Sequence, residues 1–272
     1  MLSFIGTAVF SGRNSRLKSG VLGICNRWNL ETKIYIRMES TDANRKTGGG
    51  SNSLKPDSRL EQIIHENAAD GWEKSWELGV TPWDLGRPTP ILMHLHQTGV
   101  LPKGRALIPG CGSGYDVAAT SCSERFVVGL DISENCIKRA NEGLRQLHSS
   151  SPSADHFEFV KADFFTWKPT ELFDLIFHYT VFCAIVPHMR LSWAIRIHEL
   201  LKPDGELITL MFPLSDHNGG PPYKVSVTDY EDVLSPMGFQ AEYIDDNDLA
   251  IGARKGREKL GRWKRSKSRA LL

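Results

Sequence analysis

The stretch Ile108-Pro109-Gly110-Cys111-Gly112-Ser113-Gly114 lies between an apolar segment, residues 105–108, and a segment of helical character that begins near Tyr115. We expect the apolar segment to be a strand. Glycines let the backbone turn sharply and approach a ligand closely, and the first amides of the next helix would face that ligand. The next predicted strand, 126–131, ends on Asp131 about 20 residues later, where an acid can accept hydrogen bonds from a ribose diol. The loop and the acid together predict a cofactor that contains adenosine.

The spacing of the glycines distinguishes between adenosine cofactors. A dinucleotide requires G-x-G-x-x-G, whose third glycine lets the helix pack closely beside a pyrophosphate. Here the spacing is G-x-G-x-G, and the bulky Tyr115 stands where the last glycine should be. S-adenosylmethionine carries no phosphate, so the tighter loop suits its amino acid and ribose, and Asp163, just beyond the third strand, is placed to meet the adenine or its amino group. The alternative is a plain turn followed by a solvent-exposed acid at position 131.

Beyond Pro102 the pattern alternates between strands and helices. The predicted strands are 105–108, 126–131, 157–161, 172–178, 206–211, 239–244 and 259–263, and the predicted helices between them are 115–121, 133–148, 189–201 and 228–237. A Thr-x-x-Glu capping box, Thr228 to Glu231, is expected to start the last helix. Such alternation predicts a parallel sheet with helices on both faces and a ligand over the carboxyl ends of the strands.

The composition excludes several classes of protein. The chain has 272 residues, 40% of them hydrophobic, which suffices for one large α/β domain or two small ones. Thirty-three Lys and Arg against 32 Asp and Glu leave a formal charge of +1, so no global field favours nucleic acid or an anionic membrane surface. The longest mostly apolar run, 175–187, is shorter than the roughly 20 residues that cross a bilayer. A partner must therefore be recognised by a local site.

Neither a metal site nor a disulfide framework is expected. The five cysteines show no CxxC spacing, and His94 and His96 have no carboxylate or cysteine at ligand spacing. Nine Lys and Arg lie between Arg254 and Arg269. We interpret this run as a solvated sheet edge with a frayed tail rather than as a nucleic-acid contact.

The first 56 residues are expected to lie outside the folded domain. Residues 1–37 are basic, contain several serines and have no acid before position 31, which is typical of an organellar transit peptide; alternatively, translation starts at Met38 and the leader is not translated. Residues 38–56 read as a flexible linker, and 57–272 as the domain. A start at Met38 predicts a cytoplasmic protein, and a translated leader predicts a chloroplast or mitochondrial one.

Five stretches resemble one known family of enzymes. They are Trp72-Glu73-Lys74-Ser75-Trp76, Val80-Thr81-Pro82-Trp83-Asp84, Pro109-Gly110-Cys111-Gly112, the run 126–133 and the run 199–211. Over residues 71–263 the chain is similar to the plant thiol/halide methyltransferases, the harmless to ozone layer or thiocyanate methyltransferase proteins of the thiopurine-methyltransferase-like class. The resemblance implies a class I S-adenosylmethionine-dependent methyltransferase fold, Rossmann-like, with a mostly parallel seven-stranded sheet and one antiparallel strand. It further implies methyl transfer to halide, thiocyanate or bisulfide, giving methyl halides, methyl thiocyanate or methanethiol.

The resemblance also implies which residues contact the cofactor. They are Trp72, Trp76, Trp83, Gly110, Asp131, Asp163, Phe164 and Tyr179, and the glycine spacing adds Gly112 to this set. Two positions depart from the family: His178 stands where an acid is usual, and Ser113 stands where a third consecutive glycine is usual. The first departure is expected to bear on the cofactor pocket or on acceptor preference, whereas the second leaves the neighbouring glycines in place.

Methyl transfer is an in-line displacement that needs alignment of donor and acceptor and exclusion of water more than acid or base catalysis. Halide and thiocyanate arrive ionised, which agrees with the lack of a convincing catalytic base in the sequence. We expect Trp72, Trp76 and Trp83 to form a lid over the sulfonium, with cation–π attraction of about 0.5–2 kcal/mol, or else to be core residues of an amphipathic helix. Hydroxyls of Tyr179 and Tyr223 are predicted to position the acceptor.

Two other functions stay open at this point. The same fold would methylate a larger thiol, such as a glucosinolate breakdown product or an aromatic thiol, or it would bind S-adenosylmethionine without turnover. Small anions or thiols are the expected substrates, and the chain is expected to be a monomer or a weak homodimer.

Overall fold

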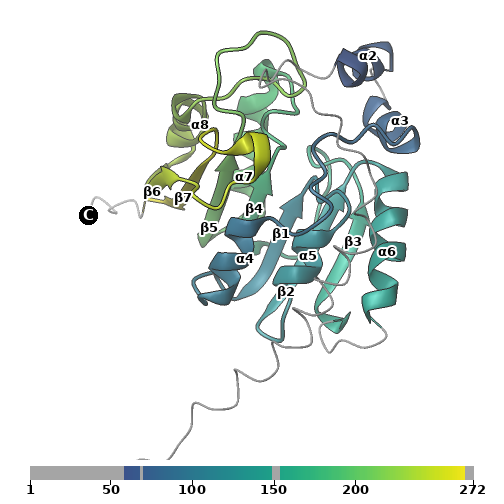
Figure 1. Cartoon of the computed structure of the whole chain (residues 1–272). Coiled ribbons are helices and arrows are strands. Elements are labelled where there is room, and N and C mark those ends of the chain that lie inside the picture. Colours follow the sequence, from purple (N-terminus) through teal and green to yellow (C-terminus); the bar gives the residue numbers. More distant parts are fainter. Residues whose placement is uncertain (1–57, 68–69, 149–153, 267–272) are drawn as a thin grey trace, which may run out of the picture. The chain divides into compact units, whose positions relative to one another are not determined.

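A single mixed sheet organises the part of the chain that the computed structural model describes, residues 58–67, 70–148 and 154–266. Our predictions for 1–37 and 38–56 lie outside these residues. Seven strands follow the order β3-β2-β1-β4-β5-β7-β6 (Figure 1). Their bounds are β1 Gly104–Pro109, β2 Arg125–Asp131, β3 Phe157–Lys161, β4 Phe173–Tyr179, β5 Leu201–Met211, β6 Phe239–Asp246 and β7 Lys259–Arg265. Strand β7 is antiparallel to β5 and β6, and the other pairs are parallel, so the predicted sheet is confirmed.

Helices cover both faces of the sheet, as the alternation predicted. Their bounds are α2 Ser58–Glu66, α3 Gly71–Glu77, α4 Pro90–Gln97, α5 Tyr115–Thr120, α6 Glu134–His148, α7 Arg190–Leu200 and α8 Val227–Leu234. Successive residues of a strand point to opposite faces. Phe177 of β4 accordingly packs with Leu92 of α4 and Val117 of α5, whereas its neighbour Ile176 packs in the core that contains Trp193 of α7.

The predicted capping box of the last helix is wrong by two residues. Ser226, in extended conformation, is the N-cap of α8: its hydroxyl accepts from the amide of Asp229, and the Asp229 carboxylate accepts from the Ser226 amide at 2.7 Å. Thr228 already lies inside the helix and has no capping role. The helix ends at Leu234 because a 3-10 turn that contains Pro236 follows, and Gly238 closes it with φ +81°.

Strand β5 begins earlier than predicted. We predicted a helix as far as residue 201 and a strand from residue 206, yet the strand starts at Leu201, which pairs with Phe173 before a register shift along β4. An irregularity in the ladder lets the strand accommodate a proline and a glycine.

Strand β1 lies between β2 and β4, so the order of the strands reverses at this point in the sheet. In open α/β sheets a ligand binds at such a reversal, outside the carboxyl ends of the strands. No helix among the described residues has the length and apolarity that crossing a membrane requires. The strand order therefore predicts a ligand near the loops that follow β1, β2 and β4.

Candidate active site

The loop after β1 is built on three glycines in the left-handed region of backbone space. Gly110, Gly112 and Gly114 have φ values of +60°, +56° and +77°. A side chain at two of these positions would also collide, since a Cβ on Gly110 would lie 2.7 Å from Val181 Cγ2 and one on Gly114 would lie 2.5 Å from Phe159. Only glycine combines this backbone conformation with this close packing.

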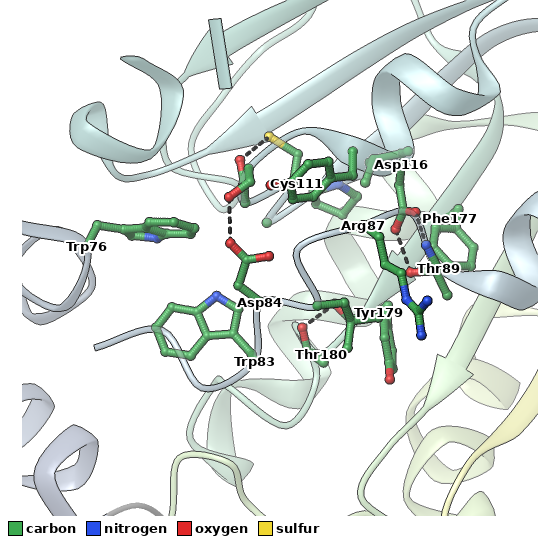
Figure 2. A pocket seen from close by; sticks show the side chains of 17 residues that line it. Trp76, Trp83, Asp84, Arg87, Thr89, Cys111, Asp116, Phe177, Tyr179 and Thr180 are labelled. Carbon is green, nitrogen blue, oxygen red and sulfur yellow. Dashed lines mark hydrogen bonds between the residues drawn. The ribbon is translucent and has the colours of Figure 1, made fainter. Parts of the chain in front are cut away.

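A cleft opens above this loop at the carboxyl ends of β1 and β4 (Figure 2). Its walls come from α3 and the loop that follows it, from the glycine loop, from the start of α5 and from the end of β4. The residues that line it are Trp76, Trp83, Asp84, Leu85, Arg87, Thr89, Ile108, Pro109, Gly110, Cys111, Gly112, Ser113, Tyr115, Asp116, Phe177, Tyr179 and Thr180. Five of the predicted site residues are therefore brought together here: Trp76, Trp83, Gly110, Gly112 and Tyr179.

Asp131 stands at the end of β2, next to the glycine loop but not on the wall of the cleft. Its carboxylate accepts the amide of Gly112 at 3.1 Å and the amide of Ser133 at 3.0 Å. Burial raises the pKa of Asp131, and these hydrogen bonds oppose that rise. Residues 131 and 162 are also joined, because the Ala162 amide donates to the Asp131 carbonyl at 3.0 Å, so the ends of β2 and β3 adjoin.

The three tryptophans form one cluster, but they face different surroundings. The ring of Trp83 lies edge-on to Trp72 and to Trp76, with centroids 5.4 and 5.9 Å apart. Trp76 and Trp83 line the cleft, and Trp72 and Trp83 pack against the small core of Leu60, Ile63 and Val80. The core interpretation is therefore correct for Trp72, and the lid role of Trp76 and Trp83 stays a prediction.

Helix α3 is tied to the start of α6 through Glu73. The Ser133 hydroxyl donates to its carboxylate at 2.5 Å, and the Asn135 side-chain amide donates at 2.7 Å. A carboxylate in this place interacts favourably with the positive end of the α6 dipole. This contact fixes the tryptophan-bearing helix beside the loop that follows Asp131.

The end of β4 is held by an ion network from a distant part of the chain. The Tyr179 hydroxyl donates to Glu258 and accepts from Arg254, and the guanidinium of Arg254 also donates to the carbonyl of Trp83 at 2.8 Å. Glu258 is buried and accepts from the side chain of Asn247 at 2.7 Å. Burial raises the pKa of the Tyr179 hydroxyl. Our interpretation of the basic run as a solvated edge is thus wrong at Arg254, which is half-buried and bonds to Tyr179 and Trp83 behind the wall of the cleft.

Three predicted residues lie elsewhere. Asp163 accepts the amide of Phe165 at 2.9 Å in the turn after β3, and Phe164 packs against the core on the α7 side of the sheet. The amide of Tyr223 donates to the carbonyl of Cys183 at 2.7 Å, which places its loop against the segment after β4. None of the three lines the cleft.

His178 faces away from the cleft. Its side chain is fully buried, with its ring centroid 5.0 Å from that of Trp193 and 6.0 Å from that of Tyr230. Neither ring nitrogen has a hydrogen-bond partner among the described residues. Burial lowers the pKa of His178 to about 3, so the ring is neutral at physiological pH. The alternation along β4 sends Tyr179 to the cleft and its predecessor to the opposite core.

Sequence reasoning missed four polar side chains on the wall of the cleft, Asp84, Arg87, Thr89 and Asp116. The Asp116 carboxylate accepts the amide and the hydroxyl of Thr89 at 2.6 and 2.8 Å, and burial raises its pKa to about 6. Asp84 accepts the Ser113 hydroxyl at 2.6 Å. Two signals pointed to Asp84: its position directly after a tryptophan of the predicted lid, and its place in the stretch Val80-Thr81-Pro82-Trp83-Asp84 that carries the resemblance.

The described residues contain no group of three or more His, Cys, Asp or Glu side chains arranged to hold a metal ion. Of the two histidines in the H-x-H pair, His96 contacts the guanidinium of Arg125 through Nδ1 at 3.0 Å. That contact gives this histidine a structural partner.

Comparison with solved structures shows the fold. The chain superposes with a TM-score of 0.53 on magnesium protoporphyrin IX methyltransferase from Synechocystis with bound S-adenosylhomocysteine, at 14% identity, covering 87% of this chain and 95% of the other. It superposes with a TM-score of 0.54 on the structure titled "Conversion of a Disulfide Bond into a Thioacetal Group during Echinomycin Biosynthesis", at 22% identity, covering 68% and 85%. The first comparison shows a class I methyltransferase fold.

Comparison of sequences gives a closer relationship. The chain is 58% identical to thiocyanate methyltransferase 1 of Brassica oleracea, over 79% of this chain and 94% of the relative. It is 55% identical to thiocyanate methyltransferase 1 of Arabidopsis thaliana, over 84% and 99%, and 56% identical to a probable thiol methyltransferase 2 of the same plant, over 81% and 96%. The model of the family described as thiopurine S-methyltransferase matches residues 67–266. With its glycine loop, its sheet order and these relatives in agreement, the chain belongs to the thiopurine S-methyltransferase family.

Proposed function

We propose that this chain transfers the methyl group of S-adenosylmethionine to a small sulfur or halide nucleophile: thiocyanate, bisulfide or a halide ion. The observation that carries the proposal is the cleft in which Trp76 and Trp83 stand beside the glycine loop at the end of β1. The similarity to the plant relatives extends over nearly their whole length, and their names support thiocyanate and thiols as the acceptor class.

The cleft has features that suit this donor. The glycine loop presents backbone rather than side chains, and a Cβ on Gly112 would project to 3.7 Å from the ring of Trp76, into the space between loop and tryptophan. Asp131 lies next to this loop, and we assign its carboxylate to the ribose diol of the donor. Asp163 and Phe164 directly follow Ala162, whose amide donates to the carbonyl of Asp131. They therefore begin next to the acid that we assign to the ribose, which supports their assignment to the adenine.

When bound, S-adenosylmethionine supplies a methyl group on a positively charged sulfur, which an anion accepts by in-line displacement. Trp76 and Trp83 exclude water and offer π faces to the cation, an attraction of about 0.5–2 kcal/mol. The charges of donor and acceptor cancel during the reaction, so a site that excludes water favours it over bulk solvent. Tyr179 fixes the wall of the cleft at the end of β4, because its hydroxyl bonds to both Arg254 and Glu258.

The acceptor requires no proton transfer when it is already an anion. We therefore assign no general base, and the acids on the wall are engaged by neutral donors: Asp84 by Ser113 and Asp116 by Thr89. Tyr223 is assigned to the acceptor side on the strength of its position in a loop that contacts the segment after Tyr179.

The proposal is tested with purified protein, S-adenosylmethionine and one acceptor at a time. We expect methyl thiocyanate, methanethiol or methyl iodide in the headspace, measured by gas chromatography, together with stoichiometric S-adenosylhomocysteine. Aromatic thiols and isothiocyanate-derived thiols serve as the comparison set. Turnover confined to those larger thiols would overturn the acceptor assignment, and cofactor binding without turnover of any acceptor would overturn the enzymatic one.

A further inference from the structure

We propose that Asp84 binds the α-ammonium group of the methyl donor and thereby recognises its amino acid end. The inference rests on the S-adenosylmethionine dependence of the proposed function and adds to it a residue that holds one defined group of the donor. It starts from the position of a carboxylate inside the cleft. Asp84 directly follows Trp83, lines the cleft with the glycine loop, and points its carboxyl group toward that loop (Figure 2).

The hydrogen bonds of this carboxylate leave it able to accept more. Oδ2 accepts the Ser113 hydroxyl at 2.6 Å, and Oδ1 accepts the amide of Gly86 at 2.8 Å. An ionised carboxylate offers about four acceptor sites, so about two stay available. Both donors are neutral, and within the described residues Asp84 forms no ion pair. Its charge is therefore available to a cation that enters the cleft.

The donor carries two positive groups, a sulfonium without N–H groups and a primary ammonium with three. The aromatic faces of Trp76 and Trp83 suit the sulfonium, which has no proton to donate. A carboxylate oxygen suits the ammonium, because a charge-assisted hydrogen bond between them is stronger than one between neutral groups. The Gly110–Gly114 loop, which Ser113 shares, is where the amino acid end of the donor was predicted from the glycine spacing.

Asp84 has a second possible role, which is structural, and substitution of Ser113 tests for it. Its bond to Ser113 also ties the loop after α3 to the glycine loop. Asp84→Asn removes the charge but keeps a carbonyl oxygen that accepts from Ser113. Ser113→Ala removes the tie but keeps the charge. The two variants therefore separate ammonium binding from loop anchoring.

The experiment measures dissociation constants by calorimetry for three ligands with the wild-type chain and both variants. S-adenosylhomocysteine has the ammonium without the sulfonium, S-adenosylmethionine has both, and 5′-methylthioadenosine has neither. We expect Asp84→Asn to weaken S-adenosylhomocysteine binding about 10- to 100-fold. Binding of 5′-methylthioadenosine should change less than about threefold, which also shows that the variant is folded. Ser113→Ala should produce a smaller loss for S-adenosylhomocysteine than Asp84→Asn does.

Three results would overturn the inference. Equal losses for all three ligands would assign Asp84 to the shape of the cleft, and a loss confined to S-adenosylmethionine would assign it to the sulfonium. A larger loss in Ser113→Ala than in Asp84→Asn would leave it as a loop anchor. If Asp84→Asn does not fold, Asp84→Glu replaces it, with a loss smaller than that of Asp84→Ala expected because the charge is kept. Turnover of acceptors by the wild-type chain is measured separately, so failure here leaves the proposed function intact.

Discussion

Replacing Gly110 with alanine tests the conformational argument for the glycine loop. The backbone at this residue has φ +60°, which costs a residue with a Cβ about 1–2 kcal/mol. The added Cβ would also stand 2.7 Å from Val181 Cγ2, where carbon atoms normally keep about 3.5–4.0 Å, so the loop or the valine must move. Overpacking of this kind costs about 1–3 kcal/mol. The two costs together predict a loss of about 2–5 kcal/mol in the free energy of unfolding.

Gly112 provides the matched control. Its φ is +56°, but a Cβ there would lie 3.7 Å from Trp76, an ordinary contact, so Gly112→Ala should lose only the backbone part, about 1–2 kcal/mol. Urea unfolding of both variants, of Val181→Ala and of the double variant Gly110→Ala/Val181→Ala completes a thermodynamic cycle. The double variant should recover the collision cost but not the backbone cost. Equal losses at both glycines, or additive losses in the cycle, would refute the reasoning.

Three further changes test the predicted ribose-binding acid, the wall of the cleft at the end of β4, and the core on the opposite face of the sheet. Asp131→Ala should weaken S-adenosylhomocysteine binding by about 1.5–3 kcal/mol, the range for hydrogen bonds to a charged group; unchanged affinity in calorimetry would remove the ribose assignment. Tyr179→Phe leaves the charges of Arg254 and Glu258 without their shared hydroxyl, so we expect a loss of about 1–3 kcal/mol in urea unfolding together with a lower kcat/KM, and an unaltered stability would contradict the network. For His178, the folded pKa near 3 lies below the unfolded value of 6.5, so the unfolded chain binds more protons and stability rises with pH across that window. His178→Phe should reduce this rise, measured as the difference from wild type at pH 4.5 and 7.5, without altering the ranking of acceptors; an identical pH dependence would exclude the histidine as its source.

Local signals predicted the features that depend on neighbouring residues. The glycine loop is one such feature, because its turn depends on the backbone freedom of residues close together in the chain. The end of β2 at Asp131 is another, since strand periodicity and one acid suffice to locate it. The alternation of strands and helices predicted the sheet and its helical layers for the same reason. The errors of this kind, such as the cap at Ser226 rather than Thr228, are shifts of a few residues.

The walls of the cleft depend on contacts between distant segments. Tyr179 and Arg254 are 75 residues apart, and the sequence around the arginine shows only a basic run that is typical of a solvated edge. Its place beside Tyr179 follows from the antiparallel return of β7 beside β5, because the turn before β7 then reaches the end of β4. Glu73 meets Ser133 60 residues away, and Asp84 meets Ser113 29 residues away, through the packing of α3 and its loop against the sheet.

The sequence alone determined the class of fold and the donor, and it predicted the glycine loop as the place where the donor binds, because the backbone conformations and strand pattern involved are encoded by residues adjacent in the chain. Only the tertiary structure decided which side chains surround that loop. It placed Trp72 against a small core and His178 on the far face of the sheet. It also brought Asp84 and Asp116 to the wall of the cleft and Arg254 against Tyr179 and Trp83. The physical reason is that these placements follow from how the elements pack across the sheet, and such long-range contacts leave no periodic signal along the chain.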